Sequence, residues 1–192
     1  MKTEFEIKFL KINKEEIKEK IKSFWWICKK ENSLMKRVVF DNPSKNNSYV
    51  RVRDEWNKIT CTYKEITESK NWDLDINSIK ELETEIKDFD SMVWIFKNLW
   101  LRQKAFQESY RETWEINWEI EIMIDEWPWI SPFIEIEWES EELVRKYSEL
   151  LWFDYLDWIF WAVDEVYFHD KWFERDFINN LKEITFENFP GK

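Results

Sequence analysis

Charged and apolar residues alternate along much of the chain, and this period of two predicts β-strands. In residues 3–10, Glu4, Glu6 and Lys8 share one face of the predicted strand, and apolar side chains occupy the other. Further runs of this kind cover residues 34–41, 49–54, 58–65, 79–87, 102–113, 116–125 and 133–138. The pattern therefore predicts about eight strands, joined mainly as antiparallel hairpins.

Other segments show the spacing of three to four residues that is typical of amphipathic helices. Helices are predicted over 13–24 and 140–151, which begin with the capping residues Asn13 and Ser140. A third is predicted over 90–99. Its apolar face is expected at Met92, Ile95, Phe96 and Leu99. Together with the strands, these helices place the chain in the α+β class, as an antiparallel sheet or barrel with flanking helices.

Tryptophan stands where this pattern requires glycine. The chain has 15 tryptophans and 1 glycine, although glycine averages roughly 7% of residues in proteins. Trp118 follows Asn117 in a predicted hairpin turn, Trp56 lies in a turn, and Trp152 follows a predicted helix where glycine commonly ends helices. Trp100 and Trp138 also end periodic segments, so we interpret all five as turn or cap positions.

These positions lead to a hypothesis about the genetic code. Most of the tryptophan codons would specify glycine in the source organism, a bacterium that reads the UGA codon as glycine. A bulky indole gains nothing in a turn with positive φ, whereas glycine adopts that φ without steric conflict. A protein that is truly rich in tryptophan is the alternative.

Length and composition predict one soluble domain over residues 1–192. The chain is 44% hydrophobic and 36% charged, and it is long enough to bury its own core. No stretch approaches the roughly 20 apolar residues of a membrane span, and the N-terminus lacks the apolar region of a secretory signal. We therefore expect a cytoplasmic protein without a membrane partner. The net charge of −11 argues against nucleic-acid binding but is compatible with a small polyanion beside local basic clusters.

The predicted strands have one apolar face and one densely charged face, and the charges are segregated by strand. Basic residues recur in phase at Arg51, Arg53, Lys58, Lys64, Arg102 and Lys104. Acidic residues recur on other strands, at Glu119, Glu121, Asp125, Glu135 and Glu137. A sheet with one solvated face would explain the periodicity. A barrel with the charged face inward would also explain the segregation, provided that a ligand balances the charges.

A ligand that is both anionic and metal-loaded would match both signs of charge. A barrel of about eight strands has room inside for one small ligand. Arginine and lysine bind phosphate oxygens, and carboxylates bind Mg²⁺ or Mn²⁺. Glu4 and Glu6 lie about 6.6 Å apart along their strand, so they can share a metal site with a neighbouring strand.

Several segments, in this order, resemble the CYTH domain, the family of triphosphate tunnel metalloenzymes. EFEIK at 4–8 resembles its Glu-x-Glu-x-Lys motif, and YVRVRDEWNKITCTYKE at 49–65 resembles its Arg-x-Arg hairpin with a Thr-x-Lys strand. ELETEIKDF at 81–89 resembles the acidic strand, and later strands are matched by QESYRETWEI at 107–116 and IMIDEWPWISPFIEIEW at 122–138. The resemblance runs from residue 3 to about 168 and leaves a C-terminal helical tail at about 169–192. It favours true tryptophan at Trp114 and Trp127.

The resemblance implies an eight-stranded antiparallel β-tunnel that binds a triphosphate with Mg²⁺ or Mn²⁺. It assigns phosphate binding to the basic residues Lys8, Arg51, Arg53, Lys64 and Arg111. It assigns metal binding or the positioning of water to the acidic residues Glu4, Glu6, Glu81, Glu83, Asp125, Glu135 and Glu137, with Glu85 as an alternative to Glu81. Relatives often carry a further basic residue at Ser109 or Tyr110, for which Arg102 or Lys104 would compensate here.

The implied activity is metal-dependent hydrolysis of inorganic triphosphate, thiamine triphosphate or a nucleoside triphosphate. The predicted catalytic residues are Glu4, Glu6, Arg51, Arg53 and Arg111, with Glu4, Glu135 or Glu137 as the base that activates water. The same motifs are compatible with a class IV adenylyl cyclase, which makes cyclic AMP from ATP, and with a non-catalytic module that binds polyphosphate or nucleotides. The expected partner is a small-molecule triphosphate, and the chain would act as a monomer or a homodimer.

Overall fold

A computed structural model describes residues 2–3, 5–45, 47–66, 79–116, 120–138, 140–154, 157 and 162–188. Glu4, Trp118, Glu119 and residues 67–78 lie outside this part of the chain.

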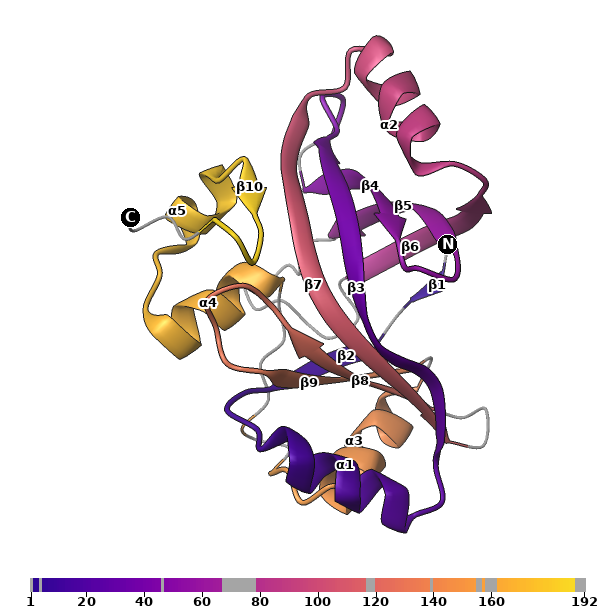
Figure 1. Cartoon of the computed structure of the whole chain (residues 1–192), viewed down its shortest axis with the longest axis vertical. Coiled ribbons are helices and arrows are strands. Elements are labelled where there is room, and N and C mark those ends of the chain that lie inside the picture. Colours follow the sequence, from indigo (N-terminus) through magenta and orange to yellow (C-terminus); the bar gives the residue numbers. More distant parts are fainter. Residues whose placement is uncertain are drawn as a thin grey trace.

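One curled antiparallel sheet forms the body of the protein (Figure 1). Its strands are β1 (Lys2–Thr3), β2 (Phe5–Phe9), β3 (Ile27–Asp41), β4 (Ser48–Asp54), β5 (Ile59–Ile66), β6 (Ile79–Ile86), β7 (Gln103–Ile116), β8 (Ile120–Glu126) and β9 (Phe133–Trp138). They are ordered β1-β6-β5-β4-β3-β7-β8-β9-β2. The predicted α+β class and the eight longer antiparallel strands are therefore confirmed, although β3 begins well before the predicted start at residue 34.

The N-terminal segment connects the two ends of this sheet. β1 pairs with β6, where Lys2 lies opposite Glu81, whereas β2 pairs with β9, where Glu6 lies opposite Glu137. Because β1 and β2 follow each other directly in the chain, the sheet curls round until its first and last strands belong to one segment. This closure gives the sheet an inner and an outer face.

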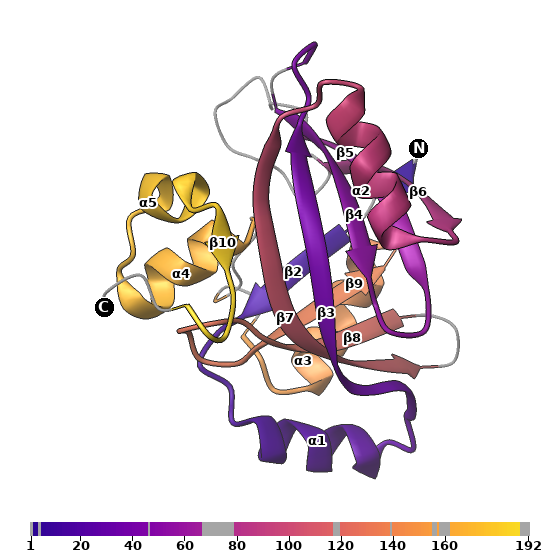
Figure 2. The ribbon, with the colours of Figure 1, turned by 45° about the horizontal axis from the view of Figure 1, so that its top comes forward.

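Three helices cover the outer, apolar face of the sheet (Figure 2). They are α1 (Lys14–Ser23), α2 (Phe89–Asn98) and α3 (Glu141–Leu150), and each begins at a capping side chain, Asn13, Asp88 and Ser140 respectively. Helices α1 and α3 pack on the apolar side chains of β2, β8 and β9, and α2 packs beside β3 and β4. The apolar face of every covered strand therefore points outward to a helix, which leaves its charged face inside.

The C-terminal elements α4 (Val163–Lys171), α5 (Arg175–Asn180) and β10 (Glu183–Ile184) form a separate packed unit beside β7. Tyr167 is fully buried in this unit, and its hydroxyl donates a hydrogen bond to the backbone carbonyl of Pro128, 2.8 Å away. Trp127 and Phe133 belong to the same apolar cluster. The unit therefore packs against the body of the sheet at residues 127–133.

Tryptophan adopts a positive φ at several chain reversals. Trp56, Trp100 and Trp152, three of the predicted turn or cap positions, have φ of 74°, 64° and 70°. Trp25, Trp129 and Trp172 share this conformation and were not predicted. The prediction that Trp138 is a turn or cap position was wrong. Trp138 is the last residue of β9, and its half-buried ring packs on the apolar core.

The apolar face of α2 also differs from the prediction. Val93 is its buried residue, with Met92 and Phe96 packed beside it, whereas Ile95 and Leu99 are largely exposed. Leu99 lies at the C-cap of the helix. By contrast, the predicted true tryptophans Trp114 and Trp127 are both buried.

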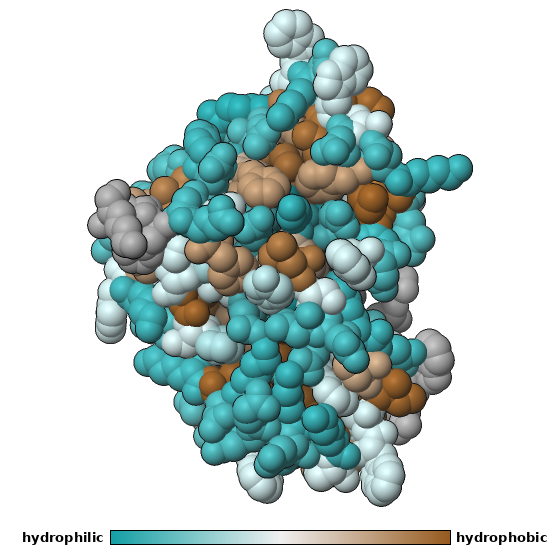
Figure 3. Space-filling view, in the orientation of Figure 1, coloured by the Kyte–Doolittle hydropathy of each residue, from teal (hydrophilic) through white to brown (hydrophobic). Residues whose placement is uncertain are grey.

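Hydrophilic side chains dominate the face of the molecule shown in Figure 3, with apolar ones interspersed among them. Among the described residues, none of the helices combines the length and the apolar character needed to cross a membrane.

Candidate active site

A charged cavity of about 430 Å³ lies inside the curled sheet. This volume is within the range of small-molecule sites, roughly 300–1,000 Å³. Its basic lining includes Lys8, Lys30, Arg37, Arg51, Arg53, Lys58, Lys64, Lys104 and Arg111. Its acidic lining includes Glu6, Glu55, Glu81, Glu83, Glu121, Asp125, Glu135 and Glu137. The charged strand faces thus surround one cavity instead of facing bulk solvent.

Three carboxylates meet where β2 runs beside β9. One oxygen from each of Glu6, Glu135 and Glu137 lies within 4.8 Å of the others. Glu6 and Glu137 are direct partners across the two strands, and their carboxylates repel each other unless a cation lies nearby. Lys8 supplies one, since its Nζ contacts Glu6 and lies 3.4 Å from Glu135 Oε2.

Lys8 is buried, which alone would lower its pKa, but the charges of Glu6 and Glu135 outweigh burial and hold the pKa above its ordinary value. The pKa of Glu135 moves the opposite way. Burial would raise it, but Lys8 and Arg111 hold it well below its usual range. Both groups therefore remain charged at neutral pH.

Arg111 on β7 links this cluster to β8. Its guanidinium binds both oxygens of Asp125, with Nε–Oδ1 at 2.7 Å and Nη2–Oδ2 at 2.6 Å, and Nη2 also lies 3.1 Å from Glu135 Oε1. Burial would lower the pKa of Arg111, but Asp125 and Glu135 hold it well above its ordinary value. The arginine is thus fixed in orientation before any ligand arrives.

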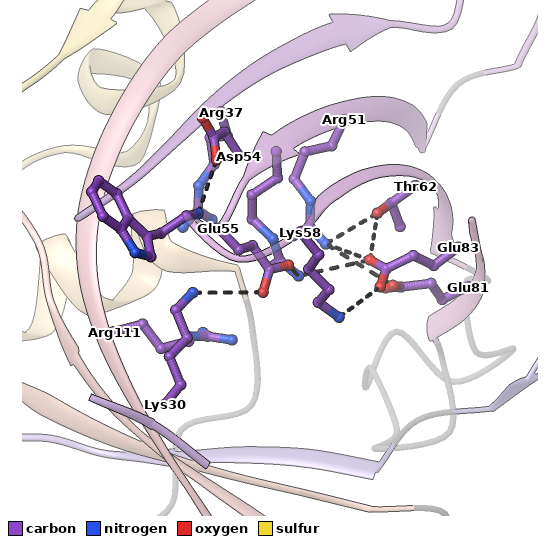
Figure 4. Close-up of polar contacts among 12 residues, drawn as sticks. Lys30, Arg37, Arg51, Asp54, Glu55, Lys58, Thr62, Glu81, Glu83 and Arg111 are labelled. Carbon is purple, nitrogen blue, oxygen red and sulfur yellow. Dashed lines mark hydrogen bonds and ion pairs between the residues drawn. The ribbon is translucent and has the colours of Figure 1, made fainter. Parts of the chain in front are cut away.

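A second group of charges covers β4, β5 and β6 on the opposite wall (Figure 4). Lys64 Nζ lies 2.6 Å from Glu81 Oε2, whereas Arg51 Nη2 lies 4.0 Å from Glu81 and 3.8 Å from Glu83. Thr62 donates a 2.8 Å hydrogen bond to Glu83 and accepts a 3.4 Å one from Arg51. The Arg51 guanidinium is therefore held loosely and can accept a stronger anionic partner.

The predicted site residues in the described part of the chain gather in this cavity. They are Glu6, Lys8, Arg51, Arg53, Lys64, Glu81, Glu83, Lys104, Arg111, Asp125, Glu135 and Glu137. Glu85, the alternative to Glu81, does not line the cavity, whereas Glu81 and Glu83 do. Glu81 therefore fits the site better than Glu85. Arg102 is an incorrect candidate, because it is exposed and pairs with Asp41 outside the cavity. Lys104 lines the cavity and bonds Asn179 of α5.

Sequence reasoning missed Lys30, Arg37 and Glu55. Glu55 follows β4 and pairs with Arg53 Nη2 at 2.5 Å, which holds the pKa of this carboxyl below its ordinary value although burial opposes the shift. Lys30 Nζ lies 3.8 Å from Glu55 and has no hydrogen-bond partner. Burial lowers the pKa of Lys30 to about 8. The position of Glu55 after the Arg-x-Arg motif was a usable signal, since it continues the same strand phase.

The carboxylate cluster suits a hard divalent cation. Mg²⁺ and Mn²⁺ prefer oxygen ligands, and Glu6, Glu135 and Glu137 present three carboxylates close together. The predicted metal ligands Asp125 and Glu81 do not belong to this cluster: Asp125 binds Arg111, and Glu81 binds Lys64. The residues present therefore fit a metal at the β2–β9 pair, and less so on the opposite wall.

Comparison with known proteins identifies the fold. A conserved hypothetical protein from Pyrococcus furiosus superposes with a TM-score of 0.67 and 25% identity, covering 82% of this chain and 95% of its own. A candidate adenylate cyclase from Vibrio parahaemolyticus gives 0.70 at 13% identity, covering 86% and 97%. A Hippeastrum protein, named as a candidate adenylyl cyclase and described as having a dominant triphosphatase activity, gives 0.51 at 13% identity, covering 88% and 95%.

A search of curated proteins finds no match. The family model described as "CYTH domain" matches residues 2–146, which include strands β1 to β9 of the curled sheet. Members of this family include triphosphatases and candidate adenylyl cyclases. On this match, and on a structure that agrees with it, the chain belongs to the CYTH domain family.

Proposed function

We propose that this protein hydrolyses a triphosphate compound inside the tunnel, with Mg²⁺ or Mn²⁺ as its cofactor. One observation carries the proposal: Arg51, Arg53 and Arg111 share a single cavity with the carboxylate cluster of β2 and β9. Phosphoryl transfer depends mainly on positioning and on neutralising charge, rather than on covalent chemistry by the protein. A cavity lined by arginines and by a cluster of carboxylates supplies both requirements.

The basic residues would position the phosphate chain and stabilise its developing charge. Among the described residues, the carboxylate partners of Arg51 are distant, at 3.8 and 4.0 Å, so a phosphate can replace them at small cost. Arg111 is fixed by Asp125 and would present its remaining N–H groups without reorganising. Lys64 and Lys8 would neutralise further phosphate oxygens from opposite sides.

The acidic residues Glu6, Glu135 and Glu137 would hold the metal ion. When bound, such an ion polarises phosphate oxygens and makes water a better nucleophile at neutral pH. A carboxylate of the Glu135–Glu137 pair would accept the proton of the attacking water, because both side chains belong to the cluster that would hold the metal. Glu4, the other candidate base, lies outside the described residues.

The test is an activity screen of the purified protein on inorganic triphosphate, thiamine triphosphate, ATP and polyphosphate, with Mg²⁺ and then Mn²⁺. Orthophosphate released only when metal is present is the expected result. A matched pair of variants, Arg53→Gln in the cavity and Arg145→Gln on the exposed side of α3, checks that the tunnel is responsible. Activity that survives Arg53→Gln unchanged would contradict the proposal.

The same screen separates the alternatives. Cyclic AMP from ATP without orthophosphate would indicate a class IV adenylyl cyclase. Tight binding of triphosphate without turnover in either metal would indicate a non-catalytic binding module.

A further inference from the structure

Arg37 is a buried arginine that faces the cavity without a carboxylate partner. It lies on β3, and 6% of its surface is exposed. Its Nη2 donates a 2.7 Å hydrogen bond to Ser109 Oγ, and its guanidinium lies over the Trp127 ring, 4.5 Å from the ring centroid. Its Nε has no hydrogen-bond partner in the part of the chain that the structure describes. Among the described residues, no carboxylate oxygen lies within 4.0 Å of its guanidinium.

The neighbours of Arg37 are cations. It is the direct partner of Arg53 across the β3–β4 pair, and like charges in this position destabilise a sheet. Burial and the charges of Arg51, Arg53 and Arg111 push the pKa of Arg37 well below its ordinary value. The protein thus holds this charge at a cost, which a nearby anion would relieve.

A purely structural role does not explain this arrangement. Stacking on Trp127 and bonding to Ser109 need a flat polar group, which a neutral side chain of similar length could supply without repelling Arg53. Within the described part of the chain, the charge itself has no carboxylate oxygen within 4.0 Å. The stacked ring and the serine instead fix the direction of the guanidinium fork and leave its Nε unpaired beside the cavity.

We propose that Arg37 is a fourth arginine of the phosphate-binding site and contacts an anionic oxygen of the substrate next to Arg53. The inference rests on the proposed function, because it takes the polyanion to be the triphosphate. It also identifies how the chain compensates for the uncharged Ser109: the basic group comes from the adjacent strand β3. Arg37 is then a substrate-binding residue, whereas Ser109 and Trp127 are positioning residues.

The test compares Arg37→Gln with Arg145→Gln, a control on the exposed side of α3 with the same change of charge. The dissociation constant for inorganic triphosphate is measured by calorimetry in EDTA, and the melting temperature is measured without ligand. Arg37→Gln should weaken binding about 10- to 100-fold, the loss expected for one charge-assisted hydrogen bond. Its melting temperature should stay equal or rise, because a like-charge repulsion is removed. Arg145→Gln should bind within about twofold of wild type.

A structural role predicts the opposite signature: a lower melting temperature with wild-type affinity in the folded protein, and this result would overturn the inference. Arg37→Lys provides a second variant in case the glutamine variant does not fold. It keeps the charge but loses the planar fork, so it should bind at least about fivefold more weakly. Wild-type affinity in either folded variant overturns the inference.

Turnover is scored separately from binding in the same preparations. Wild-type protein that binds triphosphate without hydrolysing it would refute the proposed function, while the affinity ratio would still decide the role of Arg37. Wild-type protein that binds no triphosphate would refute both.

Discussion

Asp125 holds the guanidinium of Arg111 through both of its oxygens, at 2.7 and 2.6 Å, and the carboxylate is buried while the arginine is partly buried. The family resemblance assigns Asp125 to the metal, but in this arrangement its oxygens are directed at an arginine. We propose that the aspartate positions Arg111 for phosphate binding, and this role has measurable consequences.

Asp125→Asn should lower the free energy of unfolding by about 3 kcal/mol, because it leaves Arg111 as a buried charge with one fewer partner. Triphosphate turnover should fall about 100-fold as Arg111 loses its fixed orientation. Urea unfolding and kcat/KM measure the two effects. Asp41→Asn is the matched control at the exposed Arg102 pair and should change stability by less than about 1 kcal/mol. A loss of Mg²⁺ affinity with unchanged stability would instead return Asp125 to the metal.

Glu6→Gln should abolish metal-dependent turnover while the protein still binds triphosphate in EDTA. The substitution removes one of the three clustered carboxylates but leaves the arginines of the opposite wall untouched. Orthophosphate release against Mg²⁺ and Mn²⁺ concentration is the measurement, and Glu85→Gln, outside the cavity lining on β6, is the control. Turnover at the wild-type rate in Glu6→Gln would exclude Glu6 from the metal site.

Lys30 should make triphosphate binding depend on pH. Its pKa is about 8 in the free protein because of burial, so it is only partly protonated at pH 8. A bound polyanion would raise this pKa, and binding at pH 8 should take up protons. Calorimetry in buffers of different ionisation enthalpy measures the uptake. It should shrink in Lys30→Met and persist in the control Lys97→Met, on the exposed side of α2.

The lowered pKa of Lys30 also makes the stability of the free protein depend on pH. Between pH 8 and pH 10.5 the unfolded Lys30 binds more protons than the folded one, so this group favours folding increasingly as the pH rises. A contribution from Lys30 that instead falls over this window, judged by comparison with Lys30→Met, would contradict the assigned shift.

Replacing tryptophan by glycine at turns should stabilise the fold. Trp56 and Trp100 have φ of 74° and 64° and expose 84% and 91% of their surface, so each carries the steric cost of a left-handed backbone with little burial in return. Each glycine variant should gain about 1 kcal/mol in unfolding free energy. Trp114→Gly is the opposite control: this indole is buried and donates a 2.9 Å hydrogen bond to Glu112, so its loss should cost about 3–5 kcal/mol.

The same tryptophans test the hypothesis about the genetic code. Six of the eight non-glycine residues with positive φ in the described chain are tryptophan, which is what glycine positions translated as tryptophan would produce. A mass of the protein from its source that matches 15 tryptophans would refute the hypothesis.

The sequence predicted the strands and most of the cavity because alternation with strong charges marks the inner face directly. Arg37 was not predicted because its neighbours on the inner face of β3, Met35 and Val39, are apolar. The adjacent Lys36 is charged but lies on the other face, so charge does not mark the inner face of this strand. Lys30 was missed for another reason. β3 shifts its register on both sides of Lys30, and such irregularities remove the period of two on which the prediction depends.

The closure of the sheet also has a consequence for synthesis. Residues 5–9 leave the ribosome long before their partners, residues 134–138, which emerge only after most of the sheet has been made. Contacts so distant in sequence form slowly, because closing a long loop costs conformational entropy before the strand pairing can stabilise the chain. During synthesis, β2 therefore stays unpaired and the sheet stays open until β9 has been translated.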